Sequence, residues 1–167
     1  MRPIIPAVLA MLALAACGKS STQPPPAAAP EATSEAAAPP ALTDAQKKTL
    51  LAELPAAYQS ADLDNGQAKF AICKTCHTVA KGGGVMTGPN LFGVFGRKAG
   101  TSPGFAYSDG MKTLGITWDA DKISQWIANP RALVSGTKMT YIGLENAKDR
   151  TDVVAYLKTV TSAPAAS

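Results

Sequence analysis

The sequence predicts an all-α domain made of a few helices and long loops. Apolar residues recur at helical spacing in three separate segments, 43–54, 118–129 and 145–160. The segment 80–104 is rich in glycine and has little helical period, so we expect a loop that wraps against something flat. No strand-helix-strand pattern is visible along the chain.

The first predicted helix, 43–54, carries its own start and stop signals. Thr43 and Gln46 fit a capping box, and Pro55 ends the run. The apolar residues on one side of this helix are Leu50, Leu51 and Leu54. Two alternatives remain open from the sequence: the helix packs on the rest of the domain, or it only extends a stalk.

Two further predicted helices, 66–75 and 145–160, are expected to pack against each other. Phe70 lies one turn before Cys73 and is predicted to face inward. Gly66, one turn earlier again, has no side chain and would let another helix cross closely. The apolar stripe of the partner helix consists of Val153, Tyr156, Leu157 and Val160.

The remaining predicted helix spans 118–129. Asp119 and Asp121 lie in its first turn, where negative charge is favourable. Its inward positions are Ile123, Trp126 and Ile127. Asn129 and Pro130 stop it, and a loop is expected to follow.

The N-terminal residues 1–17 are predicted to be a lipoprotein signal peptide. Arg2 forms a short positive region, and residues 4–14 form an apolar run that is too short to span a bilayer permanently. The run ends in Leu-Ala-Ala-Cys, which resembles the lipobox of bacterial lipoproteins and would make Cys17 the lipidated N-terminus. An ordinary cleavage site that happens to end near a cysteine is the alternative.

The rest of the chain divides by composition. Residues 18–61 are predicted to be an Ala/Pro-rich tether that contains the short helix, because residues 20–41 hold too few large apolar residues to fold. Residues 62–161 are predicted to be the folded domain, and 162–167 a flexible tail. The net charge of +4 suits an acidic docking partner but is too small and too dispersed to indicate nucleic acid.

The main chemical motif is Cys73-Lys74-Thr75-Cys76-His77. Cys-x-x-Cys-His is the pattern for covalent haem attachment: both thiols lie on one helical turn, and the adjacent imidazole is placed under the iron. A redox disulfide or half of a zinc site would also use two such cysteines. A zinc site needs about four ligands, and His77 is the only histidine in the sequence.

A second imidazole therefore cannot complete the coordination of an iron held by His77. The ligand opposite His77 must be methionine, lysine or water, or that position of the iron is open. Met86 lies close to His77 in a short glycine-rich loop, and Met111 reads as a flexible core residue. A whole predicted helix carries the chain around to Met139, which makes Met139 the candidate for the opposite side.

From Cys73 to Lys158 the chain resembles a class I cytochrome c of the mitochondrial type, and this stretch can be aligned without a gap. The matching stretches are Thr87-Gly88-Pro89-Asn90-Leu91, Phe95-Gly96-Arg97-Lys98, Gly115-Ile116-Thr117-Trp118, Gly136-Thr137-Lys138-Met139 and Ala155-Tyr156-Leu157-Lys158. The resemblance implies the class I cytochrome c fold with one haem c, bound covalently through Cys73 and Cys76.

The resemblance also implies roles for individual residues. Met139 would be the distal sulfur ligand, and the Pro89 carbonyl would accept a hydrogen bond from the His77 ring. Asn90 follows Pro89 in the same cofactor-binding turn. The residues expected to bond the buried haem propionates are Arg97, Tyr107 and Trp118. Thr137 would place a hydroxyl beside the distal pocket.

This chain departs from the family pattern near the distal ligand and on the surface. Ser135, Trp126 and Met111 replace a proline, a tyrosine and an asparagine that are common there, which bears on the redox potential and the Met–iron bond. Several positions of the family's lysine ring are also changed, to Ile72, Met86, Glu145, Asn146 and Ala147. The basic residues that remain are Lys81, Lys98, Lys138 and Arg131.

The expected function is a monomeric, lipid-anchored electron carrier on the periplasmic side of a bacterial membrane. The resemblance implies a cytochrome bc complex as donor and a terminal oxidase as acceptor, and it implies that the protein is not an enzyme. One alternative is a haem peroxidase or gas sensor whose Met139 dissociates. Another is an electron-accepting subunit of a periplasmic dehydrogenase.

Overall fold

The computed structural model describes residues 42–162. The predicted signal peptide 1–17 with its lipidated Cys17, the tether residues 18–41, and all but the first residue of the predicted tail 162–167 lie outside them. Over the described range, no helix combines the length and the apolar character needed to cross a membrane.

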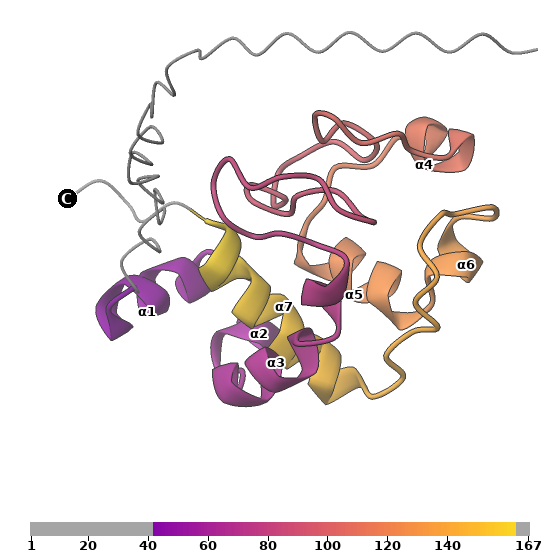
Figure 1. Cartoon of the computed structure of the whole chain (residues 1–167). Coiled ribbons are helices and arrows are strands. Elements are labelled where there is room, and N and C mark those ends of the chain that lie inside the picture. Colours follow the sequence, from indigo (N-terminus) through magenta and orange to yellow (C-terminus); the bar gives the residue numbers. More distant parts are fainter. Residues whose placement is uncertain (1–41, 163–167) are drawn as a thin grey trace, which may run out of the picture. The chain divides into compact units, whose positions relative to one another are not determined.

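The described residues form helices joined by long loops (Figure 1). The elements are α1 (Asp44–Ala52), α2 (Ala56–Gln59), α3 (Leu63–Phe70), the 3-10 turn η1 (Cys73–Thr75), α4 (Asp109–Thr113), α5 (Ala120–Ala128), α6 (Pro130–Leu133) and α7 (Ala147–Thr161). The extended pairing found in this part of the chain is one isolated bridge between Lys98 and Thr117. The prediction of an all-α fold with long loops is confirmed.

Helix α1 begins as its capping box predicts. The Thr43 hydroxyl accepts from the Gln46 N–H at 3.3 Å, and the Gln46 side chain accepts from the Thr43 N–H at 2.9 Å. The predicted helix 66–75 is wrong in its bounds. Helix α3 begins at Leu63, because the Asp62 side chain caps it, and ends at Phe70, before the tighter turn η1.

The predicted helix 118–129 is shorter in the structure. Asp119 is the N-cap of α5 and accepts from the Lys122 N–H, so Trp118 lies before the helix in an extended segment. Where a loop was predicted after Asn129, the short helix α6 begins instead, because the Asn129 side chain caps it and Pro130 occupies its first turn. The sequence analysis also missed the short helices α2 and α4.

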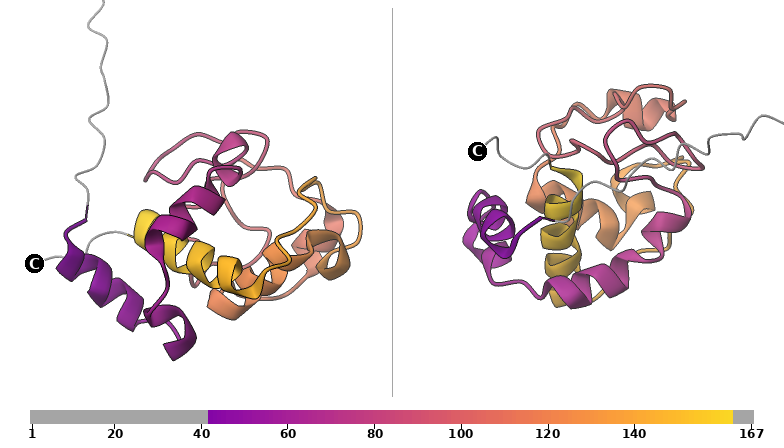
Figure 2. Two further views of the ribbon diagram at one scale, coloured as in Figure 1. Left: turned by 90° about the horizontal axis from the view of Figure 1, so that it is seen from below. Right: turned by 60° about the vertical axis from the view of Figure 1, so that its left-hand side comes forward.

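The predicted crossing of two helices at Gly66 is confirmed, and it forms the centre of the fold (Figures 1 and 2). A Cβ at Gly66 would lie 2.2 Å from the Asp152 carbonyl oxygen of α7, so the two backbones touch there. Phe70 is buried and packs on Tyr156, with ring centroids 5.6 Å apart.

Helices α1 and α2 also pack on α7, which decides between the two alternatives left open for the first predicted helix. Leu50, Leu51, Leu54 and Tyr58 are all buried. Helix α7 is accordingly buried on more faces than its predicted stripe, and Val154 and Ala155 are fully enclosed. Both views in Figure 2 show the indigo α1 on one side of the yellow α7.

Candidate functional site

A cavity of about 300 Å³ lies among η1, α5, α7 and the long loops. Nine of the ten residues predicted to bind a cofactor line it: Cys73, Cys76, His77, Pro89, Arg97, Tyr107, Trp118, Thr137 and Met139. Most of the other lining side chains are apolar, among them Phe70, Leu91, Val94, Ile123, Ile127 and Leu157. The fold thus gathers residues from distant parts of the sequence around one apolar space.

The two cysteines enter this cavity from one tight turn. The Cys76 and His77 N–H groups both donate to the Cys73 carbonyl, at 3.1 and 3.0 Å, which holds the turn closed. Both thiols are free, and burial raises the pKa of Cys73 to about 11. Two free thiols therefore lie three residues apart at the edge of an apolar pocket.

The His77 ring is fixed by the loop that follows it. Its Nδ1 lies 2.8 Å from the Pro89 carbonyl oxygen, and because that oxygen only accepts, Nδ1 carries the proton. A Cβ at Gly88 would lie 2.4 Å from the ring, so the absence of a side chain at Gly88 lets the loop pack flat on the imidazole. Burial lowers the pKa of His77, although the Pro89 bond opposes this, and the neutral ring keeps Nε2 as a free lone pair.

Asn90 is the predicted site residue that does not line the cavity. Its side-chain amide donates to the Thr78 hydroxyl at 2.7 Å and to the Ala80 and Gly83 carbonyls. Its side-chain oxygen accepts from the Phe92 N–H at 2.7 Å. Asn90 therefore ties the loop together behind Pro89 and acts on the pocket through that loop.

Three donors predicted for carboxylate groups lie on the cavity wall. Arg97 donates to the Phe92 and Asn90 carbonyls, at 3.1 and 3.0 Å, and burial lowers its pKa. Trp118 is 8% exposed and packs on Trp126, with ring centroids 5.9 Å apart. Tyr107 lies edge-on to Phe105 at 4.7 Å. The guanidinium remains charged, so a ligand with acidic groups would find a half-buried cation here.

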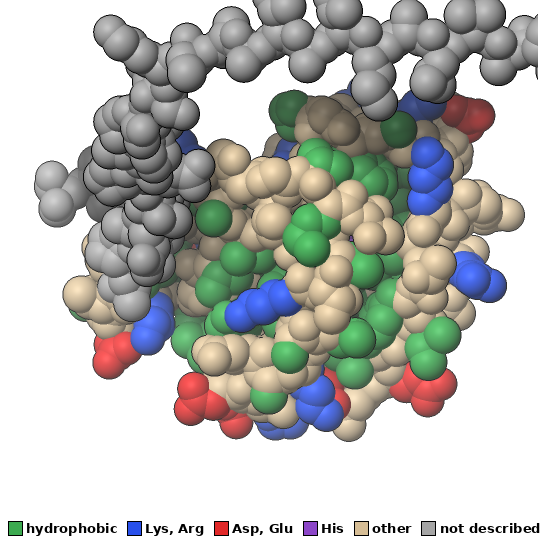
Figure 3. All heavy atoms as spheres, in the orientation of Figure 1, with side chains coloured by type: hydrophobic (Ala, Val, Ile, Leu, Met, Phe, Trp, Pro, Cys, Tyr) green, Lys and Arg blue, Asp and Glu red, His purple; other side chains and the backbone are tan. Residues whose placement is uncertain are grey.

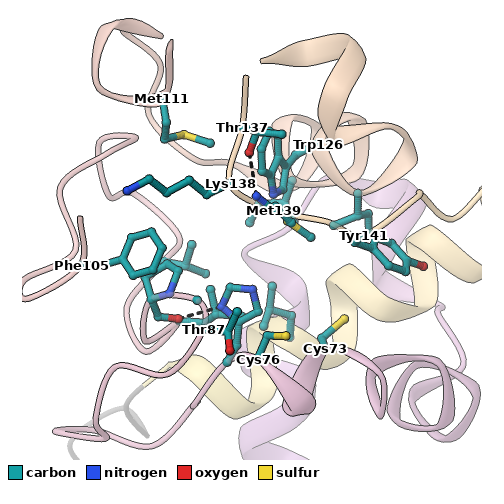
Figure 4. A pocket seen from close by; sticks show the side chains of 18 of the residues that line it. Cys73, Cys76, Thr87, Phe105, Met111, Trp126, Thr137, Lys138, Met139 and Tyr141 are labelled. Carbon is teal, nitrogen blue, oxygen red and sulfur yellow. Dashed lines mark hydrogen bonds between the residues drawn. The ribbon is translucent and has the colours of Figure 1, made fainter. Parts of the chain in front are cut away.

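Two of the three candidate methionines, Met139 and Met111, line the cavity, and Met86 does not. Met139 lies on the loop between α6 and α7, and its N–H donates to the Thr137 hydroxyl at 3.2 Å. Figure 4 shows Met139 and the two cysteines entering the opening from different elements, with space between them. Met86 is 47% exposed.

Sequence analysis missed several residues of the cavity. Phe105 and Tyr141 are aromatic residues on loops without periodicity, so no pattern marked them as lining residues. Lys138 also reaches the cavity, and its ammonium donates to the Ala106 carbonyl at 2.5 Å. The adjacent Met139 had marked this loop, but the direction of the lysine depends on the facing loop at 105–108.

These features fit a covalently bound haem. The pocket offers two free thiols on one turn, a neutral imidazole with one lone pair available, a thioether, and an apolar lining with a half-buried cation. In the described range no group of three or more His, Cys, Asp and Glu side chains is arranged to hold a metal ion. The zinc alternative therefore gains no support from this part of the chain.

The comparisons with known proteins lead to the same cofactor. The sequence model of the cytochrome c family matches residues 63–161. Cytochrome c2 of Rhodomicrobium vannielii is 45% identical over 104 residues, which cover 62% of this chain and 83% of that protein. Cytochrome c of Gibberella zeae is 47% identical over 101 residues, covering 60% and 95%.

The structural comparison agrees. Cytochrome cH from Methylobacterium extorquens matches with a TM-score of 0.55 and 44% identity, over 59% of this chain and 99% of that one. The predicted class I fold is thereby confirmed. The chain belongs to the cytochrome c family and is a class I, monohaem electron carrier with one haem c attached covalently through cysteines.

Proposed function

We propose that this protein is a membrane-tethered carrier that takes single electrons from a cytochrome bc complex and delivers them to a terminal oxidase in the periplasm. One observation carries the proposal: His77 and Met139 line the same pocket from two different parts of the chain. If both residues held the iron of a bound haem, no position would be left on it for a substrate. The site then exchanges electrons and does not bind or convert a small molecule.

In this proposal the chain's residues hold the cofactor in one geometry. Cys73 and Cys76 form the thioethers, and the Pro89 carbonyl fixes the tautomer and the orientation of His77. Thr137 accepts from the Met139 N–H, which restrains the backbone that carries the thioether. The bound haem supplies reversible one-electron exchange between ferric and ferrous iron, and a methionine ligand raises its potential.

The pocket wall performs two further tasks. Its apolar lining excludes water from the iron, and Arg97, Tyr107 and Trp118 supply donors for the haem propionates. A carboxylate buried without such donors would destabilise the loaded protein.

We further propose that lipid on Cys17 anchors the protein to the periplasmic side of a bacterial membrane. Residues 18–41 would act as the tether and, if extended at about 3 Å per residue, would reach roughly 70 Å. Exchanging Cys17 for serine should move the protein from the membrane fraction to the soluble fraction of the cell. Membrane retention of this variant, with the signal peptide removed, would contradict lipid anchoring.

The surface around the pocket supports weak electrostatic steering. Ile72 lines the pocket and is 54% exposed, Met86 is 47% exposed beside the lining residue Thr87, and Ile142 is 90% exposed beside the lining residue Tyr141. On the face shown in Figure 3, Lys and Arg side chains are spread out and do not gather in one patch. Tethering would replace part of the steering, because it raises local concentration without any contact.

Electron transfer from the tethered protein to its oxidase should therefore depend only weakly on ionic strength. The matched measurement uses a variant in which Ile72 and Met86 are both exchanged for lysine, which restores two positions of the family's ring. A steeper salt dependence in this variant than in the natural chain is expected. An equally steep loss of rate in both would contradict the proposal.

The ligand assignment is tested by optical spectra of the haem-loaded protein. We expect the weak long-wavelength charge-transfer band of methionine on ferric iron, and no change when carbon monoxide is added to the reduced form. Met139→Leu should abolish the band and admit carbon monoxide, whereas Met111→Leu, a change of another methionine in the same pocket, should do neither. A natural chain that lacks the band and binds carbon monoxide readily would favour the peroxidase or sensor function.

A further inference from the structure

Residues 43–61, here called the arm, precede the part of the chain that the family model matches. The arm contains α1 and α2, and its large apolar side chains are buried. The relative exposures are 5% for Leu50, 9% for Leu51, 7% for Leu54 and 5% for Tyr58. A segment that only extended a stalk would leave these side chains in water, so the arm is docked.

Two polar contacts fix the position of the docked arm. The Tyr58 hydroxyl donates to Oδ1 of Asp121 at 2.8 Å, in the first turn of α5. Glu53 pairs with Lys158 of α7 at 2.7 Å. The two contacts reach different helices, so the arm spans from α7 to the first turn of α5, directly after Trp118 and Asp119.

The segment that leads into α5 forms one wall of the haem pocket. In this wall, residues 95–98 pair with residues 116–118. The Gly96 N–H donates to the Trp118 carbonyl at 2.8 Å, and the Trp118 N–H donates to the Arg97 carbonyl at 2.9 Å.

The two sides of this wall face different spaces. Arg97 and Trp118 line the haem pocket. Gly96, Thr117 and Trp118 line a second cavity, whose other side is formed by three arm residues, Glu53, Leu54 and Pro55. Trp118 lines both spaces and is buried, so at this residue a single layer of chain separates the haem pocket from the space beside the arm, whereas Gly96 and Thr117 are exposed.

We propose that the arm is a positioning element of the haem site, which holds the wall in place at Trp118 and keeps water from reaching the cofactor past this side chain. Arg97 and Trp118 sit on this wall, so their placement depends on what supports it from behind. Exclusion of water favours the ferrous form, which carries less charge, and so raises the reduction potential. This inference needs the haem pocket but not the tether or the redox partners.

The test compares two variants of the full-length, haem-loaded protein, each of which carries one new aspartate in the same part of the arm. Leu54→Asp puts a charge into the buried contact and should release the arm. Ala52→Asp adds the same charge two residues earlier, at an exposed position, and should leave the arm docked. The difference between the two variants removes the direct effect of the added charge on the iron.

In Leu54→Asp we expect the amides of α1 and α2 to exchange hydrogen about tenfold faster or more, together with the wall amides of Gly96 and Trp118. We also expect a negative shift of the midpoint potential relative to Ala52→Asp. Faster exchange in the arm with wall amides and potential equal to those of Ala52→Asp would overturn the proposal.

A second variant tests the proposal without introducing a charge. Residues 43–61 contain two lysines and two acidic residues, so replacing them with a Gly-Ser linker of equal length leaves the net charge unchanged. In this variant the wall amides should exchange hydrogen as fast as in Leu54→Asp, and the midpoint potential should be more negative than in the natural chain. A linker variant with natural wall exchange and natural potential would show that the arm is only docked and positions nothing.

Discussion

Helix α3 and the arm both pack on α7, but they do so at different depths. Helix α3 crosses α7 at Gly66, where the two backbones are in contact, and the buried Asp152 lies at the crossing. The arm packs on α7 through side chains: Leu54 and Tyr58 are buried, and Glu53 pairs with Lys158 of α7, while the Tyr58 hydroxyl bonds to α5.

The difference indicates how each contact responds to change. A backbone crossing has no room for adjustment, because helices that touch at a glycine cannot move apart without losing the surrounding packing. Side-chain contacts at the edge of a domain can open locally while the rest of the protein stays folded. We therefore expect α3 to control the stability of the whole domain and the arm to control one wall of the pocket.

The largest effect is expected from Gly66→Ala. Its Cβ would meet the Asp152 carbonyl oxygen at 2.2 Å and the Tyr156 Cβ at 2.9 Å, so α3 and α7 must separate. The free energy of unfolding should fall by about 3 kcal/mol, even though alanine favours helix. Gly84→Ala is the control, because nothing lies within 4 Å of a Cβ there. Similar denaturant midpoints for the two variants would show that the crossing tolerates a side chain.

Asp152→Ala should have the next largest effect. The Asp152 carboxylate is 1% exposed and accepts from the Asp62 N–H, the Asn65 amide and the Lys148 ammonium, at 2.9, 2.7 and 2.7 Å. Removing it takes the acceptor from the part-buried bonds of the Asp62 N–H and the Asn65 amide, and should lower the free energy of unfolding at pH 7 by about 2 kcal/mol. Asp109→Ala, which breaks an exposed pair with Lys112, should cost far less.

The effect of Asp152 should also depend on pH. Burial by itself would raise the pKa of this carboxyl, but the bonds from Lys148, Asn65 and Asp62 lower it below the ordinary value of 3.8. Its contribution to stability is therefore complete above pH 4 and is lost as the pH falls further. In urea unfolding, the difference between Asp152→Ala and the natural chain should stay the same from pH 5 to pH 4 and shrink as the pH falls below 4. A difference that stays constant below pH 4 as well would contradict the ionised network.

The α3 side of this comparison could be predicted from the sequence, because Gly66 and Phe70 each have one simple physical reason for their position. The arm side could not. The stripe of Leu50, Leu51 and Leu54 predicts that one face of the helix is buried, but it does not indicate which part of the chain covers that face. The identity of that partner depends on contacts with residues about a hundred positions later in the chain, such as Lys158.

The candidate site shows the same division. The spacing of Cys73, Cys76 and His77 is a local requirement of the chemistry, so the sequence alone predicted it. The position of Asn90 is set by the Thr78, Ala80 and Gly83 groups of a folded loop, and no periodicity describes such a loop. For Trp118 the sequence predicted a pocket residue, but its second face, against the arm, depends on tertiary packing.

A smaller effect is expected from Tyr58→Phe, which removes one hydrogen bond of the arm and keeps its ring. Docking should weaken by about 1 kcal/mol at pH 7, measured by hydrogen exchange of α1. Burial first, and then the hydrogen bond to Asp121, raise the pKa of Tyr58 from 10.0 to about 12, with nearby Asp119 acting in the same direction and Ser124 against it. The tyrosine contribution is therefore complete below pH 10 and is lost as the pH rises towards 12. Identical exchange profiles for the two proteins across this window would mean that the Asp121 bond does not hold the arm.

The smallest effect is expected from Lys158→Met, which removes the ion pair with Glu53. The glutamate side chain is 55% exposed, so the pair is screened. Met retains most of the apolar stem of the lysine but also loses the contact of the ammonium over the Phe95 ring, at 5.3 Å from its centroid. Arm docking should weaken by no more than about 0.5 kcal/mol, and this difference should disappear at high salt. Lys112→Met is the control: it removes the exposed pair with Asp109, and its effect on stability shows what a surface ion pair contributes when it does not hold a segment in place. A larger loss of docking free energy that persists at high salt would show that the ion pair is a main contact of the arm. The arm would then be bound as firmly as α3.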